Sequence, residues 1–355
     1  MNGYERALAT LSFQKTDRVA TWGGWIANVD FFERVTGRDY WKDPRRTAFD
    51  AYRAIQVDLV VQDVCLPPSP QEWRKHTDET LVGHQKYGTP EQVCRYVEAL
   101  PSDARLAEGF DLQSEMQVAL ESYMPLQREL GNEIFCLPQF ACANFTWFRE
   151  FGYTSYLAAM ALYPEVIGRL LRHDAERQRL KNMALAELVK QGSMQPFFMH
   201  GTDICGMRGP MASPQTLRRL FFPGLKRALE PLVEIGADLI WHSDGYIIPL
   251  VDDLIGCGIT GFQGFQENTG FDVTDIAAKS TRKREKPIIM AGLSVTDVLR
   301  RGTVSDTEHE VERIIDSVGR GGGLLIGTAS TADPDCRVEN LQALYRHTHT
   351  YGARA

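Results

Sequence analysis

The feature that most constrains the fold of this 355-residue chain is a regular alternation of short apolar runs and amphipathic segments after residue 195. Short apolar runs bounded by turn formers are typical of strands buried on both faces. We expect such strands at 196–200, 238–241, 260–265, 286–291 and 323–326. Helical patterns follow at 214–230, 248–257, 273–279, 294–301, 307–318 and 337–351. This βα alternation predicts parallel strands.

Three further apolar runs precede this region and complete a set of eight strands. They lie at 18–22, 59–62 and 133–137. Eight strands with intervening helices predict one (β/α)8 TIM barrel, a single domain over residues 1–355 with elaborated N-terminal βα loops. A long amphipathic helix is expected over 163–189, and the proline-containing stretch 65–101 reads as an elaborated loop or small cap.

Composition narrows the function classes. The net charge of −7 argues against a nucleic-acid-binding surface, and no run of apolar residues is long enough to span a membrane. The N-terminus carries no apolar signal core, so we expect a cytoplasmic protein. We also expect a small-molecule substrate. The sequence leaves open whether the protein forms a homodimer. The seven scattered cysteines, with no Cys-x-x-Cys pair, are expected to be free thiols.

The segment 239–245 combines an apolar run with three polar residues and a glycine. In an extended backbone His242 and Asp244 would point the same way, just past the carboxyl end of a strand. Functional groups gather at that end in barrel enzymes. The alternative is that Ser243 and Asp244 cap the next helix.

Other polar and aromatic residues follow the predicted strands and would share that rim. Asp63 follows an apolar strand and could be either a helix or turn cap or a catalytic residue. Glu267 lies close to Phe265 in the sequence. It could be a partly desolvated proton carrier, a metal ligand or a surface carboxylate. Arg6, Asp17 and Arg18 are expected to form a structural ion pair at the opposite end of the barrel. The predicted substrate-binding residues are Trp22, Trp25, Asn144, Trp147 and His200.

One imidazole and two carboxylates, from His242, Asp244 and Glu267, suit zinc or another borderline divalent ion. These ligands would converge only through the fold, because their spacing matches no local metal motif. Cys205 could add a thiolate, or it could be inert packing.

Several motifs spread over nearly the whole chain match one known superfamily. They are Glu5-Arg6-Ala7-Leu8, Asp17-Arg18-Val19, Tyr163-Pro164-Glu165, Ser213-Pro214, Phe222-Pro223, His242-Ser243-Asp244-Gly245, Gly302-Thr303, Gly321-Gly322-Gly323, Glu339-Asn340 and Tyr351-Gly352. With these motifs the chain resembles the uroporphyrinogen decarboxylase superfamily, which includes the corrinoid-linked methyltransferases. The resemblance implies a (β/α) barrel and no particular substrate.

Departures from the superfamily pattern favour the methyltransferase branch. The decarboxylases carry an arginine-rich segment after the first strand, where this chain reads Trp-Gly-Gly-Trp-Ile-Ala-Asn over 22–28. The carboxylates of an octa-anionic tetrapyrrole would have no arginine partners in this segment. Asp63 nonetheless matches the active-site aspartate of the decarboxylases.

The methyltransferase branch holds zinc with a His-x-Cys pair and a later Cys. Here His242 matches the histidine, Asp244 stands in place of the first cysteine and Ser330 stands near the second. Oxygen donors in place of thiolates argue against a thiol-activating zinc and indicate either a harder metal site or no metal site, with a substrate such as a methyl ether.

The resemblance therefore predicts an enzyme that moves a methyl group between a small substrate, such as an aromatic methyl ether, and a corrinoid (cobalamin) carried by a partner protein. Trp22, Trp25 and Trp147 would wall an apolar pocket, and Asp63 would give a proton to the departing oxygen. His242 and Glu267 would hold a metal or polarise that oxygen. The alternatives are a decarboxylase of a less anionic substrate and a non-catalytic corrinoid- or tetrapyrrole-binding protein.

Overall fold

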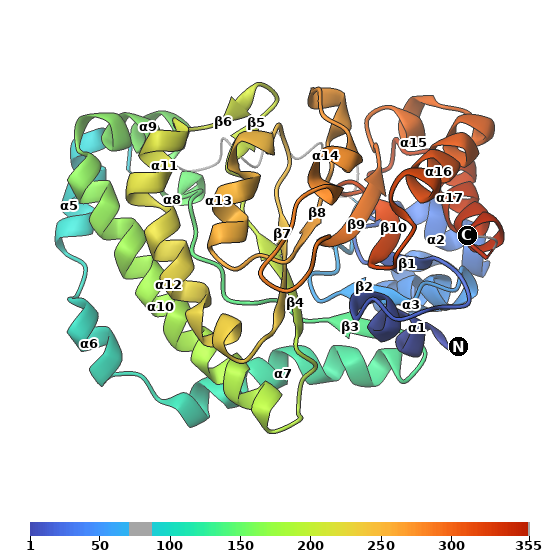
Figure 1. The fold of residues 1–355 in the computed structure, drawn as a ribbon, viewed down its shortest axis with the longest axis horizontal. Helices are drawn as coiled ribbons and strands as arrows, with labels where there is room; N and C mark the ends of the chain where they lie inside the picture. Colours follow the sequence, from blue (N-terminus) through green and yellow to red (C-terminus); the bar gives the residue numbers. More distant parts are fainter. Residues whose placement is uncertain (71–86, 354–355) are drawn as a thin grey trace. The chain divides into compact units, whose positions relative to one another are not determined.

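The computed structural model describes residues 1–70 and 87–353 and contains all eight predicted barrel strands. The eight parallel strands and the helices between them form a (β/α)8 barrel, as predicted (Figure 1). The strands are β1 (Ala20–Gly23), β2 (Leu59–Val61), β3 (Phe135–Leu137), β4 (Phe197–Gly201), β7 (Asp238–His242), β8 (Gly261–Gln263), β9 (Ile288–Leu293) and β10 (Leu324–Thr328).

The chain divides into two compact units. Unit 1 comprises Met1–Arg74, Glu121–Gln139 and Thr260–Ala355, and unit 2 comprises Lys75–Leu120 and Phe140–Ile259. Helix α7 (Leu112–Leu130) contains one boundary between them.

Unit 1 carries six strands in the order β3-β2-β1-β10-β9-β8. Trp22 of β1 pairs with Leu59 of β2, and Ala20 pairs with Leu325 of β10. All six residues of β9 are buried, as expected for a parallel strand covered on both faces. The α-helices of this unit are α1 (Gly3–Leu11), α2 (Val29–Thr36), α3 (Pro44–Ala54), α14 (Val273–Ala277), α15 (Val298–Arg301), α16 (Val304–Val318) and α17 (Val338–Tyr351), with 3-10 turns η1 (Tyr40–Lys42) and η4 (Glu267–Thr269).

The predicted ion pair at the N-terminal end of the strands is present, and its central member is Asp58. Arg6 contacts Asp17 and Asp58, each at 2.6 Å, and Arg18 contacts Asp58 at 2.6 Å. Asp58 has no exposed side-chain surface, so its charge is balanced by two guanidinium groups inside the protein. The pairing ties the first helix to the start of β2.

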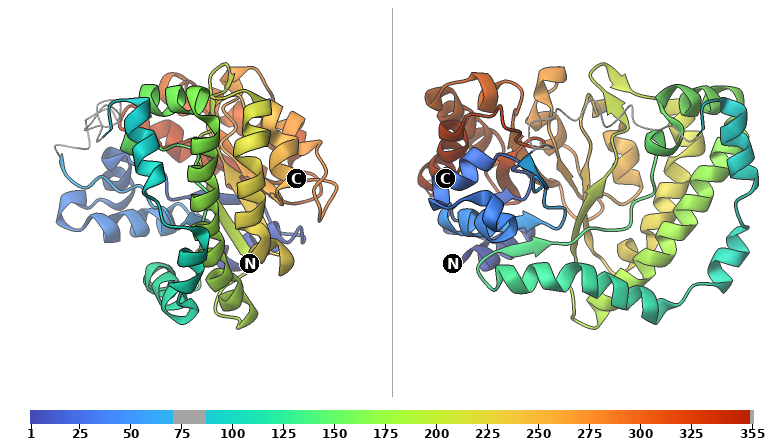
Figure 2. Two further views of the ribbon diagram at one scale, coloured as in Figure 1. Left: turned by 90° about the vertical axis from the view of Figure 1, so that its left-hand side faces the viewer. Right: turned by 180° about the vertical axis from the view of Figure 1, so that it is seen from behind.

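Unit 2 is built on the parallel pair β4–β7 and on a layer of long helices. Helix α10 (Pro164–Lys190) matches the predicted long helix and packs along α12 (Phe222–Glu234), as Figure 2 shows. The remaining elements of the unit are α5 (Pro90–Glu98), α6 (Asp103–Glu108), α8 (Phe148–Phe151), α9 (Tyr153–Leu162), α11 (Pro214–Leu220), α13 (Val251–Gly256), the 3-10 turn η3 (Ile248–Leu250) and the hairpin β5–β6 (Cys205–Gly206 and Gly209–Pro210).

One local prediction was wrong. The expected helix over 214–230 is two helices, because Pro223 lacks an N–H and lies in the first turn of a new helix. The stretch 65–101, predicted to be an elaborated loop or a small cap, contains α5, where Thr89 and Gln92 form a capping box ahead of an apolar face. The part of that stretch over 71–86 lies outside the described residues.

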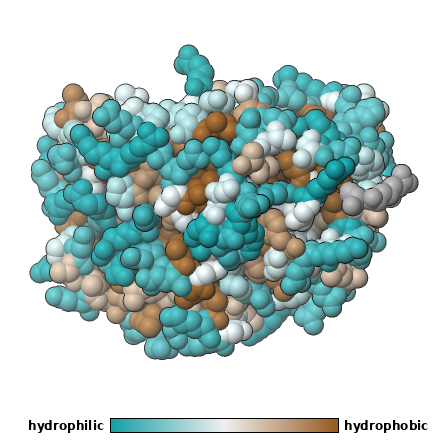
Figure 3. Space-filling view, viewed as in Figure 1, coloured by the Kyte–Doolittle hydropathy of each residue, from teal (hydrophilic) through white to brown (hydrophobic). Residues whose placement is uncertain are grey.

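Hydrophilic residues dominate the face seen in Figure 3, with hydrophobic residues in small groups between them. Across the described ranges, no helix combines the length and apolar character that crossing a membrane requires.

Candidate functional site

The loops that follow β4 and β7 begin side by side. The two strands pair in parallel, with Gly201 opposite His242. A side chain at position 201 would collide with the carbonyl of His242, so the approach depends on glycine. The polar residues after each strand are thereby brought together at the carboxyl end of the pair.

Hydrogen bonds join these loops. Ile204 N–H donates to the Ser243 hydroxyl at 3.4 Å, Asp244 N–H donates to the Asp203 carboxylate at 2.8 Å, and Tyr246 N–H donates to the Gly206 carbonyl at 3.0 Å. The next helical turn, η3, has no side-chain cap. The helix-cap alternative for Ser243 and Asp244 is therefore wrong, because Ser243 bonds the neighbouring loop and Ile247 occupies the cap position.

Asp203, His242 and Asp244 form a cluster in which one ligand atom from each lies within 4.8 Å of the others. His242 Nε2 lies 3.8 Å from Asp203 Oδ1, and the two side chains are 18% and 48% exposed. Ligand atoms around a tetrahedral ion with bonds of about 2.0–2.1 Å are about 3.3 Å apart, so a small inward movement would suffice. The donor set, one imidazole and two carboxylates with access to solvent, fits a borderline divalent ion with an open coordination position.

A chain of hydrogen bonds connects Thr202, beside the cluster, to a buried carboxylate on α10. Asp174 is 1% exposed and accepts from the Asn144 N–H at 2.7 Å. The Asn144 side-chain oxygen accepts from the Thr146 N–H and hydroxyl at 2.9 and 3.1 Å, and the Thr146 hydroxyl lies 2.9 Å from that of Thr202. Asn144, predicted to bind substrate, thus lies within a network that fixes the loop before Asp203.

Other predicted residues of unit 2 have defined contacts. His200 Nδ1 lies 2.9 Å from the Phe140 carbonyl, and Trp147 is 9% exposed, with its indole N–H bonded to the Asn144 carbonyl at 3.0 Å. Cys205 is buried, and burial together with the Asp203 carboxylate raises the pKa of its thiol to about 12. Among the described residues, the side chains that come together as candidate metal ligands are Asp203, His242 and Asp244, without Cys205.

In unit 1, Asp63 follows β2 with an exposed carboxylate. Its backbone carbonyl accepts from the Trp25 indole N–H at 2.8 Å. Within residues 1–70 and 87–353, no helix uses the Asp63 side chain as its cap. The geometry therefore offers a solvent-accessible carboxylate at a strand end and gives no support to the capping alternative.

Two further predicted residues of unit 1 are held by structural contacts. Trp22 is fully buried, with its indole N–H bonded to the Ala291 carbonyl at 3.2 Å, so it has no surface for a substrate to contact in this conformation. Glu267 accepts from Arg313 at 2.5 Å and from the Val273 N–H at 2.6 Å. Burial raises the pKa of Glu267, while these two donors act in the opposite direction.

The structure thus brings together His242 and Asp244 as predicted, and it adds Asp203, which the sequence reasoning did not single out. Asp203 lies three positions after His200, in the polar run at the end of β4. That run was a usable signal, because β4 and β7 are successive strands of the βα series. Ser330 is half-buried after β10, in unit 1.

No protein-family model matches the chain, and no curated protein sequence matches it. A solved structure described as a methyltransferase from Methanosarcina mazei is similar over 98% of this chain and 98% of its own, with a TM-score of 0.64 and 15% sequence identity. At that identity the likeness concerns the fold, so this chain shares the architecture of the Methanosarcina mazei methyltransferase along almost its entire length.

Proposed function

We propose that the protein is a methyltransferase that moves a methyl group between a small substrate, such as an aromatic methyl ether, and a corrinoid carried by a partner protein. The observation that carries this proposal is the Asp203–His242–Asp244 cluster at the carboxyl ends of β4 and β7. The fold shared with a methyltransferase and the superfamily motifs support it.

The cluster favours zinc or a similar divalent ion held by one nitrogen and two oxygen donors. Such an ion, when bound, would act as a Lewis acid toward a substrate oxygen. His242 and Asp244 would orient it from one loop, and Asp203 from the other. With one imidazole and two carboxylates as donors, the set suits an ether or hydroxyl oxygen better than a thiol.

In the proposed reaction the carbon–oxygen bond of the ether breaks and the methyl group passes to the reduced cobalt of the corrinoid. The ether oxygen keeps the bonding electron pair and takes a proton. We assign that proton donation to Asp63, whose exposed carboxylate follows β2. Trp147, which is 9% exposed and belongs to the same unit as the cluster, is the aromatic residue assigned to the substrate's ring.

Incubating the zinc-loaded protein with free reduced cobalamin and aryl methyl ethers tests this function. We expect methylcobalamin and the corresponding phenol to form in equal amounts, followed by absorbance and chromatography. The Asp203→Ala protein should lose this activity, whereas Glu230→Gln, an exposed position on α12, should keep it.

Failure of methyl transfer across a panel of ethers would overturn the proposal. Release of CO₂ from a small carboxylated substrate would establish the decarboxylase alternative, and tight corrinoid binding without turnover would establish a binding protein. Uroporphyrinogen itself should not be decarboxylated, because segment 22–28 has no arginine for its carboxylates.

A further inference from the structure

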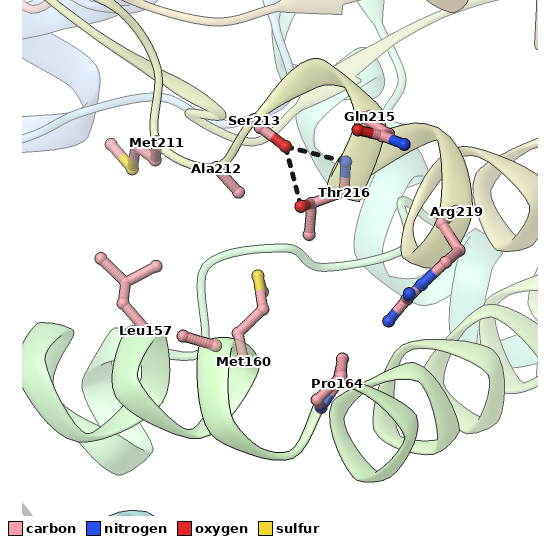
Figure 4. Close-up of a pocket in the computed structure, with 10 residues that line it drawn as sticks. Leu157, Met160, Pro164, Met211, Ala212, Ser213, Gln215, Thr216 and Arg219 are labelled. Atoms are coloured by element: carbon pink, nitrogen blue, oxygen red, sulfur yellow. Dashed lines mark hydrogen bonds between the residues drawn. The ribbon is translucent and has the colours of Figure 1, made fainter.

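Unit 2 contains a cavity that is separate from the Asp203–His242–Asp244 cluster. It lies between the α9–α10 corner and residues 211–219, and its volume is about 530 Å³ (Figure 4). Small-molecule sites in proteins have volumes of about 300–1,000 Å³. The cavity is therefore large enough for a ligand of its own, and none of the three cluster residues lines it.

The lining is divided into an apolar side and a polar side. Leu157 and Met160 point from α9 into the space, and Met211 flanks it from the opposite wall (Figure 4). Ser213 and Thr216 lie on the polar side, but the Ser213 hydroxyl accepts from the Thr216 N–H at 3.1 Å and lies 2.8 Å from its hydroxyl. These hydroxyls are already used in capping α11.

Arg219 is the charged group among the described side chains that line the cavity, and no carboxylate is among them. Its guanidinium lies 3.5 Å from Glu165, and the two side chains are 58% and 83% exposed. Ion pairs this exposed contribute little. A ligand carboxylate that makes two parallel hydrogen bonds to a guanidinium would compete well with Glu165.

The neighbouring Arg218 differs from Arg219 in the ion pair that it forms. It is 57% exposed, like Arg219, yet its Nε lies 2.9 and 3.0 Å from the two Asp253 oxygens. Arg218 does not line the cavity. The two adjacent arginines thus provide a matched pair, one in a tight ion pair and one facing the cavity.

We propose that this cavity binds a small amphipathic carboxylate. The apolar part of the ligand would pack against Leu157, Met160 and Met211, and its carboxylate would pair with Arg219. The proposal is independent of the methyl-transfer site.

Octanoate is a suitable probe. The control compounds are 1-octanol, which lacks the negative charge, and acetate, which lacks the long alkyl chain. Titration calorimetry should give a dissociation constant of about 1 mM or tighter for octanoate, and binding at least about tenfold weaker for 1-octanol and for acetate. In protein with ¹³C-methyl methionine, octanoate should shift the Met160 and Met211 signals, assigned through leucine replacements.

Variants then locate the site. Arg219→Gln should weaken octanoate binding about tenfold or more, while Arg218→Gln leaves it unchanged. Ala161→Trp, at an exposed lining position, should block binding without disturbing the core. The proposal is overturned if the Met160 and Met211 signals do not move at ~10 mM octanoate. Equal affinity in the Arg219→Gln and wild-type proteins would overturn it as well.

Discussion

The backbone N–H of Asp244 donates a 2.8 Å hydrogen bond to the carboxylate of Asp203. The bond crosses from the loop after β7 to the loop after β4 and holds the carboxylate beside His242. A carboxylate fixed in this way loses little freedom when it binds a ligand, which is how preorganised sites gain affinity.

Replacing Asp203 tests whether the cluster binds a metal. We expect Asp203→Ala and His242→Ala each to weaken zinc binding by at least about 100-fold, because each removes one of three protein ligands. Competition with a chromophoric chelator measures the affinity, and Glu230→Gln serves as the control. Unchanged zinc affinity in both alanine variants would show that the cluster is a hydrogen-bonding or proton-transfer site.

The hydrogen-bonded chain from Asp174 predicts a smaller loss of zinc affinity than the removal of a ligand does. Thr146→Val removes the hydroxyl that contacts Thr202 and should lower zinc affinity about tenfold by loosening the loop that carries Asp203. Thr146→Ser keeps the hydroxyl and should restore the affinity. Equal zinc affinities in the valine and serine variants would mean that the chain supports the fold alone.

The substitution Asp63→Asn distinguishes a role of Asp63 in proton transfer from a role in stabilising the fold. The exposed carboxylate caps no described helix, so the substitution should change the free energy of unfolding by less than about 0.5 kcal/mol. Turnover should fall by roughly 10²–10⁴-fold, because asparagine cannot deliver a proton. The comparison is with Asp30→Asn, an exposed aspartate on α2. A variant that keeps most of its activity would remove Asp63 from the mechanism.

His349 should make the protein sensitive to acid. Burial, with Arg18 and Arg6 nearby, lowers the pKa of His349 to about 3, and its Nε2 lies 3.4 Å from the Thr21 hydroxyl. An unfolded chain protonates histidine near pH 6.5, so the unfolded state binds one more proton between these values. The free energy of unfolding should therefore fall as the pH drops from about 6.5 toward 3.

Urea unfolding at a series of pH values tests this sign. His349→Gln should flatten the decline below pH 6.5, whereas His309→Gln, at an exposed position on α16, should leave it unchanged. The same slope in wild-type and His349→Gln proteins would assign the acid sensitivity to other groups.

The barrel strands were predictable because each is an apolar run with turn formers around it. The run expected at 238–241, for example, extends by one residue to His242. The same local pattern identified His242 and Asp244, since a strand end is visible in sequence. The partnership of Glu267 with Arg313 was not visible, because ion pairs between residues 46 positions apart leave no periodic signal.

Asp203 was overlooked for a different reason. It stands between Gly201-Thr202 and Ile204, in a context that resembles an ordinary turn. Its role depends on the loop pairing that Gly201 and Gly245 permit, and Gly245 adopts a φ of +88° against the 205–206 backbone. Such close backbone approaches are decided by packing in three dimensions, and the residue types alone do not specify them.

The pairing of β1 with β10 has a consequence for how the chain folds during synthesis. Ala20 has Leu325 as its strand partner, so the first strand must wait for a neighbour that is translated about 300 residues later. At roughly 5–20 residues per second the delay is about 15–60 s. Until then one hydrogen-bonding edge of β1 has no native partner, so a nascent chain halted before β10 should depend on chaperones.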